Sequence, residues 1–264
     1  MPSTPPIDFD PIKYMNMFHL SDDLEVKIQQ NIGPQKKSVV VIDNFYKDPD
    51  AVRQLCLESE KKNDPQLLSY MPGTRVHIET TEVRRKLYSL FKELCFDRDI
   101  WGPNGNPPDV GHFNNEWQRA AFMCNVINDQ TLMDKPMGII PHQDSYTMEL
   151  PPIKSNHAAV IYLNTPEECA GGTNLWSKCG EMSIPRKGNT GIHHPPRPQE
   201  TMDSREVFEH IHWSLFNNEE WKVEHEFEMV YNRMALYESK VLHSQNVDLG
   251  MFTDYDRINQ VLFM

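Results

Sequence analysis

Apolar positions in the first part of the chain follow one strand pattern and two helical patterns. The run SVVVID, which ends at Asp43, is short, apolar and rich in β-branched residues, so it predicts a buried strand. Asp48 and Pro49 come next and are typical of the N-cap and the first position of a helix. A second helix is predicted after Thr81, because apolar residues recur there at helical spacing. A loop rich in Gly, Pro and Asn is expected at 101–115.

After this loop the pattern changes from helical to extended. Four segments are short, rich in β-forming residues and separated by Pro, Gly and Asn clusters: AFMCNVI, IYLN, MALYES and RINQVLFM. Such a series is typical of an antiparallel sandwich or barrel. It is interrupted at 179–232 by a polar, Pro- and Gly-rich stretch and a predicted helix at 203–216. We expect this insertion to be a lid, because long insertions in a β core are usually functional.

These patterns predict one domain over residues 1–264, mainly β with flanking helices (α+β). Residues 1–115 are expected to supply supporting strands and helices, and residues 116–264 the β core with its insertion. A chain of 264 residues with 39% apolar residues can bury a substantial core.

The net charge and the cysteine content indicate which kinds of partner and which cellular compartment to expect. The formal net charge of −12 repels phosphate backbones and anionic lipid, so we expect a small-molecule substrate, with no nucleic acid and no membrane. The N-terminal sequence lacks the pattern of a secretory signal. The five cysteines form no CxxC pair, which favours a reducing cytoplasm. Cys169 and Cys179 flank a glycine turn, and free thiols are favoured over a disulfide between them.

Candidate metal ligands begin with the segment PHQD, which contains His142 and Asp144. Residues i and i+2 of a strand point to the same face, so both side chains can reach one ion. His243, in LYESKVLHS, offers a third ligand on a late strand. Two histidines and one carboxylate make the facial triad of non-haem Fe(II) oxygenases, which leaves coordination positions open. A second pair of this kind, His77 and Glu79, is discounted because it precedes a helix rather than lying between sheet strands.

A candidate anion site lies on the last predicted strand. Arg257 follows His243 by 14 residues, and strand alternation places Arg257 on one face with Asn259, Val261 and Phe263. An arginine that faces a β core is costly unless an anion meets it. A dicarboxylate co-substrate would supply that anion, because guanidinium and carboxylate form a bidentate pair. The alternative is an ion pair with a neighbouring carboxylate, Asp254 or Asp256.

Taken together, these motifs resemble the Fe(II)/2-oxoglutarate-dependent dioxygenases, in particular the prolyl-hydroxylase-like and phytanoyl-hydroxylase-like branches. The resemblance covers residues 40–264 approximately. The motifs are PHQD at 141–144, AVIYLN at 159–164, GGTNLW at 171–176, YNRMALYESKVLHS at 231–244 and RINQVLFM at 257–264.

The resemblance implies a double-stranded β-helix, or jelly roll, with Fe(II) held by His142, Asp144 and His243. It also implies that Arg257 binds the distal carboxylate of 2-oxoglutarate. A further polar contact to 2-oxoglutarate is expected from Asn125, with Thr173 as the alternative; Thr173 could equally be a turn residue. Prolyl hydroxylases use a lysine nearer the distal histidine, so this chain lies outside that branch. Asp144 disfavours halogenation, because the related halogenases lack this carboxylate.

The implied reaction is the O₂-dependent hydroxylation of a C–H bond in a small, amino-acid-like metabolite, with release of succinate and CO₂. The alternative is a non-catalytic, cupin-like β-barrel that binds a metal or a ligand. Arg257 separates the two hypotheses, because a plain cupin has no need of an inward anion anchor.

Overall fold

The structure, a computed structural model, describes residues 14, 16–61, 72–94, 121–144, 157–184 and 202–263. Two antiparallel sheets form its centre. The larger sheet consists, in spatial order, of β1 (Glu25–Ile32), β2 (Lys37–Asp43), β8 (Met234–Glu238), β5 (His157–Tyr162), β10 (Arg257–Phe263), β4 (Phe122–Ile127) and β3 (Thr74–Ile78). The smaller sheet consists of β7 (Trp221–Glu228), β6 (Gly172–Lys178) and β9 (His243–Asn246).

Helices in the described residues begin where the sequence supplies caps. The Asp48 side chain accepts a hydrogen bond from the backbone N–H of Ala51 at 3.0 Å and begins the helix at 49–58, as predicted. Asp203 accepts from the backbone N–H of Glu206 at 2.9 Å and begins the helix that was predicted near residue 203. None of the described helices combines the length and the apolar character of a membrane span. The helices are α2 (Pro49–Glu58), α3 (Thr81–Lys92), α4 (Asp129–Asp134), α5 (Ser204–Phe216) and the 3₁₀ helices η4 (Pro136–Ile139) and η5 (Pro166–Glu168).

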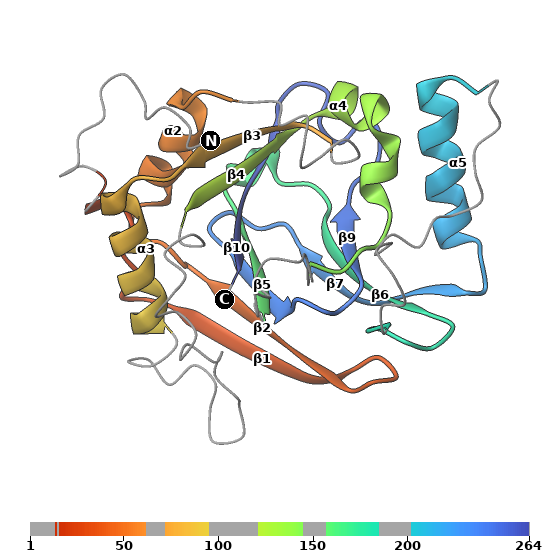
Figure 1. The fold of residues 1–264 in the computed structure, drawn as a ribbon, viewed down its shortest axis with the longest axis horizontal. Coiled ribbons are helices and arrows are strands. Elements are labelled where there is room, and N and C mark those ends of the chain that lie inside the picture. Colours follow the sequence, from red (N-terminus) through yellow and green to blue (C-terminus); the bar gives the residue numbers. More distant parts are fainter. Residues whose placement is uncertain are drawn as a thin grey trace.

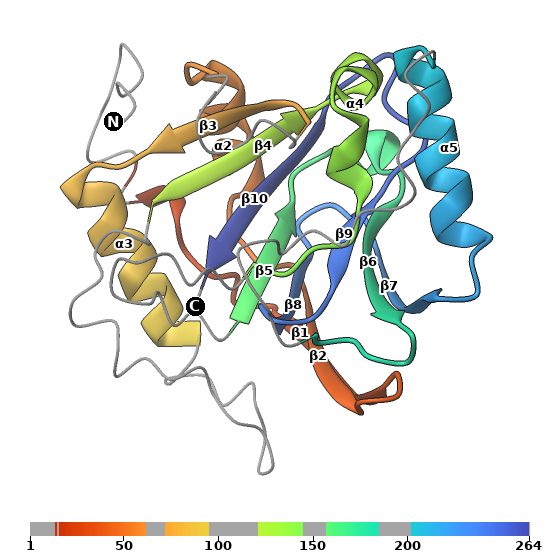
Figure 2. The ribbon, with the colours of Figure 1, turned by 45° about the vertical axis from the view of Figure 1, so that its right-hand side comes forward.

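The larger sheet separates two apolar layers. Apolar residues of α2 and α3 pack on one face of it, together with alternate residues of β3, β4 and β10. The opposite face packs against the smaller sheet and α5. Figures 1 and 2 show this order, with α2 and α3 at one side, the sheets in the middle and α5 at the other side. We call the face of the larger sheet that is turned toward the smaller sheet its inner face.

This architecture confirms the predicted class, mainly β with flanking helices and antiparallel sheets. Five strands predicted from sequence are present as β2, β4, β5, β8 and β10.

The predicted insertion at 179–232 is too long. β7 lies within it and pairs with β6 from Gly172↔Glu228 to Lys178↔Trp221, so this part belongs to the smaller sheet and not to a lid. The polar stretch at 185–201 and the loop predicted at 101–115 lie outside the described residues.

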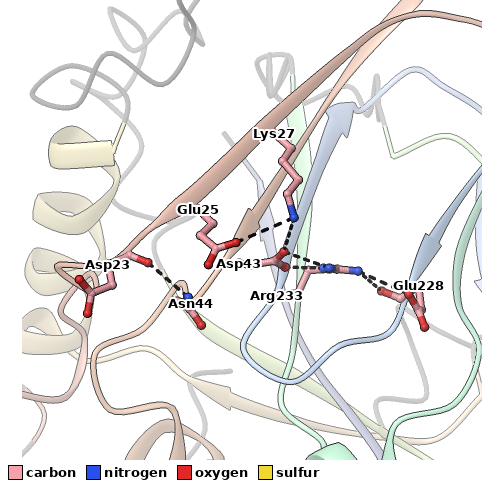
Figure 3. A network of polar contacts seen from close by, with 7 residues as sticks. All are labelled: Asp23, Glu25, Lys27, Asp43, Asn44, Glu228 and Arg233. Carbon is pink, nitrogen blue, oxygen red and sulfur yellow. Dashed lines mark hydrogen bonds and ion pairs between the residues drawn. The ribbon is translucent and has the colours of Figure 1, made fainter.

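An ion-pair network joins the two sheets at one end (Figure 3). Asp43, the last residue of β2, accepts hydrogen bonds from Lys27 on β1 at 3.2 Å and from Arg233 Nη2 at 3.0 Å. Arg233 precedes β8 and lies 3.9 Å from a carboxylate oxygen of Glu228, at the end of β7. Strands β1, β2, β7 and β8 are therefore connected by charged groups as well as by packing.

Candidate metal centre

The backbone brings the predicted ligands together. His142 pairs with His243 as an antiparallel bridge, and the backbone N–H of each donates to the carbonyl of the other at 2.9 Å. The backbone N–H of Asp144 donates to Ser239 O at 2.9 Å. The segment that follows η4 is thereby held against the start of β9. Gln143 lies between the two ligands, and its side chain donates to Lys240 O.

Three side chains converge at this point. The Nε2 atom of His243 lies 3.0 Å from Asp144 Oδ2, and Nε2 of His142 lies 3.7 Å from Asp144 Oδ1. The candidate ligand atoms of the three residues all lie within 4.8 Å of one another. These distances suit one ion with two imidazole ligands and one carboxylate ligand.

Both imidazoles are oriented by the backbone. Nδ1 of His243 lies 2.9 Å from Val241 O, and Nδ1 of His142 lies 3.3 Å from Ile140 O. A carbonyl only accepts hydrogen bonds, so each Nδ1 carries the proton when its ring is neutral. The lone pair of each ring is then on Nε2, which faces Asp144. Backbone carbonyls commonly orient metal-binding histidines in this way.

Burial and their mutual charges shift the pKa values of all three side chains. Burial and the neighbouring His243 lower the pKa of His142 to about 4, so its imidazole is neutral. Burial tends to raise the pKa of Asp144, but the two histidines outweigh it and hold this pKa below the ordinary value. Burial tends to lower the pKa of His243, and the adjacent Asp144 reverses this and raises it. Of the two imidazoles, His243 is therefore the one for which protons compete more strongly with a bound cation.

Arg257 is buried without a carboxylate. Its side chain is 2% exposed and lies on the inner face of β10. One guanidinium nitrogen, Nη2, donates to Gly172 O at 3.1 Å, and Nη1 donates to Asn259 Oδ1 and Gln245 Oε1. Among the described residues, no carboxylate forms an ion pair with it, so the alternative with Asp254 or Asp256 is not present. Burial lowers the pKa of Arg257, and its Nε has no hydrogen-bond partner.

Comparison with known protein families identifies the family of this chain. Residues 24–257 match a family described as "Family of unknown function (DUF6445)". The chain belongs to this family. A search of curated proteins found no match.

The other predicted contact residues of this DUF6445 chain also lie between the sheets. Thr173 on β6 is buried and accepts a hydrogen bond from the Tyr162 hydroxyl at 2.8 Å. Asn125 is half-buried on β4, and its side chain makes no hydrogen bond to any described residue. In register it lies opposite Asn259, which accepts from Arg257. Of these two candidates, Thr173 already takes part in a hydrogen bond, whereas the side-chain amide of Asn125 makes none to a described residue.

The glycine turn has the structural role that was expected. Gly171 and Gly172 have φ angles of +64° and +154°. A Cβ on Gly172 would lie 1.8 Å from Phe227 O, so no other residue fits there. This close approach also positions Gly172 O to accept from Arg257. Cys169 and Cys179 are free thiols.

Sequence reasoning missed two residues near the ligands of this DUF6445 chain. Tyr237 on β8 is buried, and its ring centroid lies 4.8 Å from that of His243. Arg75 on β3 was not considered. It lies in register with Asn125, and its charge acts on the pKa of both His142 and Asp144. The discounted pair, His77 and Glu79, does precede a helix: His77 lies on β3, an edge strand of the larger sheet, and Glu79 lies between β3 and α3. Arg75 could have been found from the segment TRVHI, in which apolar and polar residues alternate as they do in a half-buried strand.

Proposed function

We propose that this DUF6445 chain is a non-haem Fe(II)- and 2-oxoglutarate-dependent oxygenase. Iron is held by His142, Asp144 and His243, which leave one side of the ion for other ligands. The finer fold assignment, a double-stranded β-helix, belongs to the same proposal and is supported by the two antiparallel sheets that pack face to face. The resemblance of the motifs to this superfamily supports both.

One observation carries the proposal beyond metal binding: Arg257 is buried in the same interior as the triad with no carboxylate partner among the described residues. A buried, unpaired guanidinium is unfavourable, so this arrangement favours an anionic ligand. Tyr237 lies near both groups: its ring centroid is 4.8 Å from that of His243, and its pKa, which burial raises, is raised further by Asp144 and lowered by Arg257. A dicarboxylate between the ion and Arg257 satisfies both.

Each protein group then has a definite task. His142 and His243 present neutral Nε2 atoms, and Asp144 presents a carboxylate. Arg257 binds the distal carboxylate of 2-oxoglutarate as a charge-assisted pair. The buried aromatic residues Tyr162 and Tyr237 lie beside Arg257 and His243 and would exclude water there. Bound Fe(II), with 2-oxoglutarate and O₂, supplies the oxidising chemistry, and the protein supplies orientation and a dry environment. A small metabolite is the proposed substrate.

The decisive experiment follows Fe(II) and 2-oxoglutarate separately. Anaerobic protein is loaded with Fe(II) and titrated with 2-oxoglutarate, while the metal-to-ligand absorption band is recorded. Aerobic samples are then assayed for succinate, with and without Fe(II). We expect the band in the parent and its loss in His243→Ala. Metal binding without any effect of 2-oxoglutarate would instead support the cupin-like metal-binding alternative.

A further inference from the structure

Two amide side chains hold the buried guanidinium of Arg257. Its Nη1 atom donates to Asn259 Oδ1 on the same strand, β10, and to Gln245 Oε1 on β9 at 3.4 Å. A third acceptor, Gly172 O on β6, takes a hydrogen bond from Nη2 at 3.1 Å. All three acceptors are uncharged. They fix the position of the guanidinium and leave its charge without a counterion among the described residues.

The orientation of both amides follows from these contacts. A guanidinium only donates hydrogen bonds, so the amide atom that faces Arg257 is the oxygen in Asn259 and in Gln245. The NH₂ group of each amide is then turned away from Arg257. Neither NH₂ group makes a hydrogen bond to a described residue. Each amide therefore offers N–H donors beside a buried positive charge.

Donors in this arrangement suit a carboxylate. A carboxylate only accepts hydrogen bonds, and each of its oxygens can accept more than one. The amides supply neutral donors, and Arg257 supplies the charge that strengthens the interaction. A neutral ligand could accept from the same donors, but it would leave the buried charge of Arg257 uncompensated.

Strand β9 connects this position to the metal ligands. His243 and Gln245 are two residues apart on β9, and both face the larger sheet. The ring centroid of His243 lies 4.8 Å from that of Tyr237 on β8, and Gln245 accepts from Arg257 on β10. Two residues of a strand span about 7 Å. A ligand that reaches from an ion at His243 to the amide of Gln245 is therefore short.

We infer that Gln245 and Asn259 complete the anion position: their oxygens hold Arg257, and their NH₂ groups donate to the distal carboxylate of a short dicarboxylate. This inference rests on the proposed function for the identity of that ligand as 2-oxoglutarate. It requires both side chains to be neutral. A carboxylate at either position would pair with Arg257 and take the place of the ligand anion.

The test exchanges each amide for a carboxylate of nearly the same shape. Gln245→Glu and Asn259→Asp add a negative charge beside Arg257, and Gln245→Met removes the amide without adding charge. Gln30→Glu is the matched control, because it adds the same charge at an exposed position of the edge strand β1. Circular dichroism of each variant without ligand checks that the fold is retained.

Three ligands separate the distal carboxylate from binding to the ion. Protein loaded with Mn(II), a redox-stable substitute for Fe(II), is titrated calorimetrically with 2-oxoglutarate, 2-oxovalerate and glutarate. 2-Oxovalerate keeps the 2-oxo acid group but has a methyl group in place of the distal carboxylate. Glutarate keeps both carboxylates but lacks the 2-oxo group. The ratio of the Kd of 2-oxovalerate to that of 2-oxoglutarate therefore measures the distal carboxylate alone.

In the parent, 2-oxoglutarate should bind much more tightly than 2-oxovalerate. Gln245→Glu and Asn259→Asp should each reduce this ratio about 10-fold or more, because Arg257 is then paired within the protein. Gln245→Met should reduce it less, since hydrogen bonds are lost but the charge of Arg257 stays available. The affinity for 2-oxovalerate should change little in all variants. Gln30→Glu should bind all three ligands as the parent does.

The inference is overturned if Gln245→Glu and Asn259→Asp keep the ratio of the parent. It is also overturned if they weaken 2-oxovalerate as much as 2-oxoglutarate, because the amides would then have only a structural role. If Gln245→Glu does not fold, the ratio in Gln245→Met decides in the same way. If the parent binds glutarate but not 2-oxoglutarate, and Gln245→Glu weakens glutarate, the proposed oxygenase function is wrong and the anion position remains. A parent that binds none of the three ligands contradicts both proposals.

Discussion

At the scale of single residues, hydrogen bonding divides the atoms of the candidate site into occupied and available ones. In both histidines, Nδ1 is held by a backbone carbonyl and Nε2 faces Asp144. In Arg257 both terminal nitrogens donate to neutral oxygens, and the positive charge has no counterion among the described residues. Neutral acceptors satisfy the geometry of a guanidinium but do not offset the cost of burying its charge. A ligand anion is the remaining source of that compensation.

Replacing Arg257 should therefore weaken the co-substrate and not the metal. Removal of one partner from a buried charge pair costs about 2–5 kcal/mol. We expect Arg257→Leu to bind 2-oxoglutarate roughly 30-fold to several thousand-fold more weakly. Arg257→Lys should be intermediate, because a point charge cannot reproduce the bidentate pair. Anaerobic titration of the Fe(II) protein with 2-oxoglutarate measures both variants.

The control for this prediction is iron affinity, which should change little in either variant because Arg257 touches no metal ligand. Arg205→Leu, on the exposed face of α5, controls for loss of charge. If Arg257→Leu binds 2-oxoglutarate as tightly as the parent, the anchor of the distal carboxylate lies elsewhere and Arg257 has a structural role.

Gly172 offers a prediction about stability. Its φ angle is +154°, and a Cβ there would lie 1.8 Å from Phe227 O, a backbone atom that cannot rotate away. Gly172→Ala should lower the free energy of unfolding by about 2 kcal/mol or more. Gly180 is the matched control, because it has φ +81° but nothing within 4 Å of a Cβ. Gly180→Ala should cost about 1 kcal/mol, from backbone strain alone. Urea unfolding measures both, and equal losses would contradict the steric explanation.

At the scale of elements, strand position explains much of what the sequence could predict. The predicted strands β2, β4, β5, β8 and β10 are the five interior strands of the larger sheet. The missed strands β1, β3 and β7 are edge strands, but β6, the buried middle strand of the smaller sheet, was missed as well, and the edge strand β9 begins at His243, where a late strand was expected. An interior strand has two neighbouring strands and a strong apolar signal. An edge strand has only one neighbouring strand, and its apolar signal is weaker. Most residues of the edge strand β1 are exposed.

The same reason explains what was found and missed in the site. His142 and Asp144 are separated by two positions in the sequence, and Arg257 is on an interior strand, so local pattern was sufficient for them. Arg75 is on β3 and was overlooked with it. Its approach to the ligands depends on the register between β3 and β4. Registers between strands that are distant in the sequence cannot be read from a single pattern.

The network of Asp43 and Arg233 makes a prediction about pH. The hydrogen bond from Arg233 lowers the pKa of Asp43 below its ordinary value of 3.8. A carboxyl whose folded pKa is lowered stabilises the fold above its unfolded pKa, and this contribution is lost as pH falls through the folded pKa. We expect Asp43→Asn to lose about 1 kcal/mol of unfolding free energy at neutral pH. Between about pH 5 and about pH 2 its stability should then fall less steeply than that of the parent.

Asp22 is the control for this pair. It forms an ion pair with Lys47 at 2.8 Å, but both side chains are largely exposed. Exposed pairs contribute little, so Asp22→Asn should follow the pH dependence of the parent. Urea unfolding at several pH values measures all three proteins. A parallel pH dependence in Asp43→Asn and the parent would show that Arg233 and Asp43 do not couple β2 to β8 in solution.

At the scale of the whole molecule, the metal centre joins parts of the chain that are far apart in sequence. His142 and Asp144 follow η4, and His243 begins β9 in the smaller sheet. An ion bound by all three requires the segment after η4 and the smaller sheet to be folded together. Binding to the folded state alone shifts the unfolding equilibrium by mass action.

Metal removal should therefore destabilise the whole fold. At free metal of about 100 times Kd, the ion should add about 2.7 kcal/mol to the free energy of unfolding, and a chelator should abolish this gain. The gain should also shrink on acidification. The pKa of His243 is raised above 6.5, so protons compete with the ion from above that pH downwards, whereas His142, with a pKa of about 4, stays neutral for longer. Anaerobic Fe(II) or Co(II) titrations followed by thermal unfolding measure both effects.

Two variants control for the site of binding. Asp144→Ala should show no metal-dependent rise in Tm. In Asp134→Ala, an exposed change on α4, the metal should raise the Tm as much as in the parent. If Asp144→Ala is stabilised as much as the parent, the ion binds elsewhere in the chain and the candidate centre is not its site.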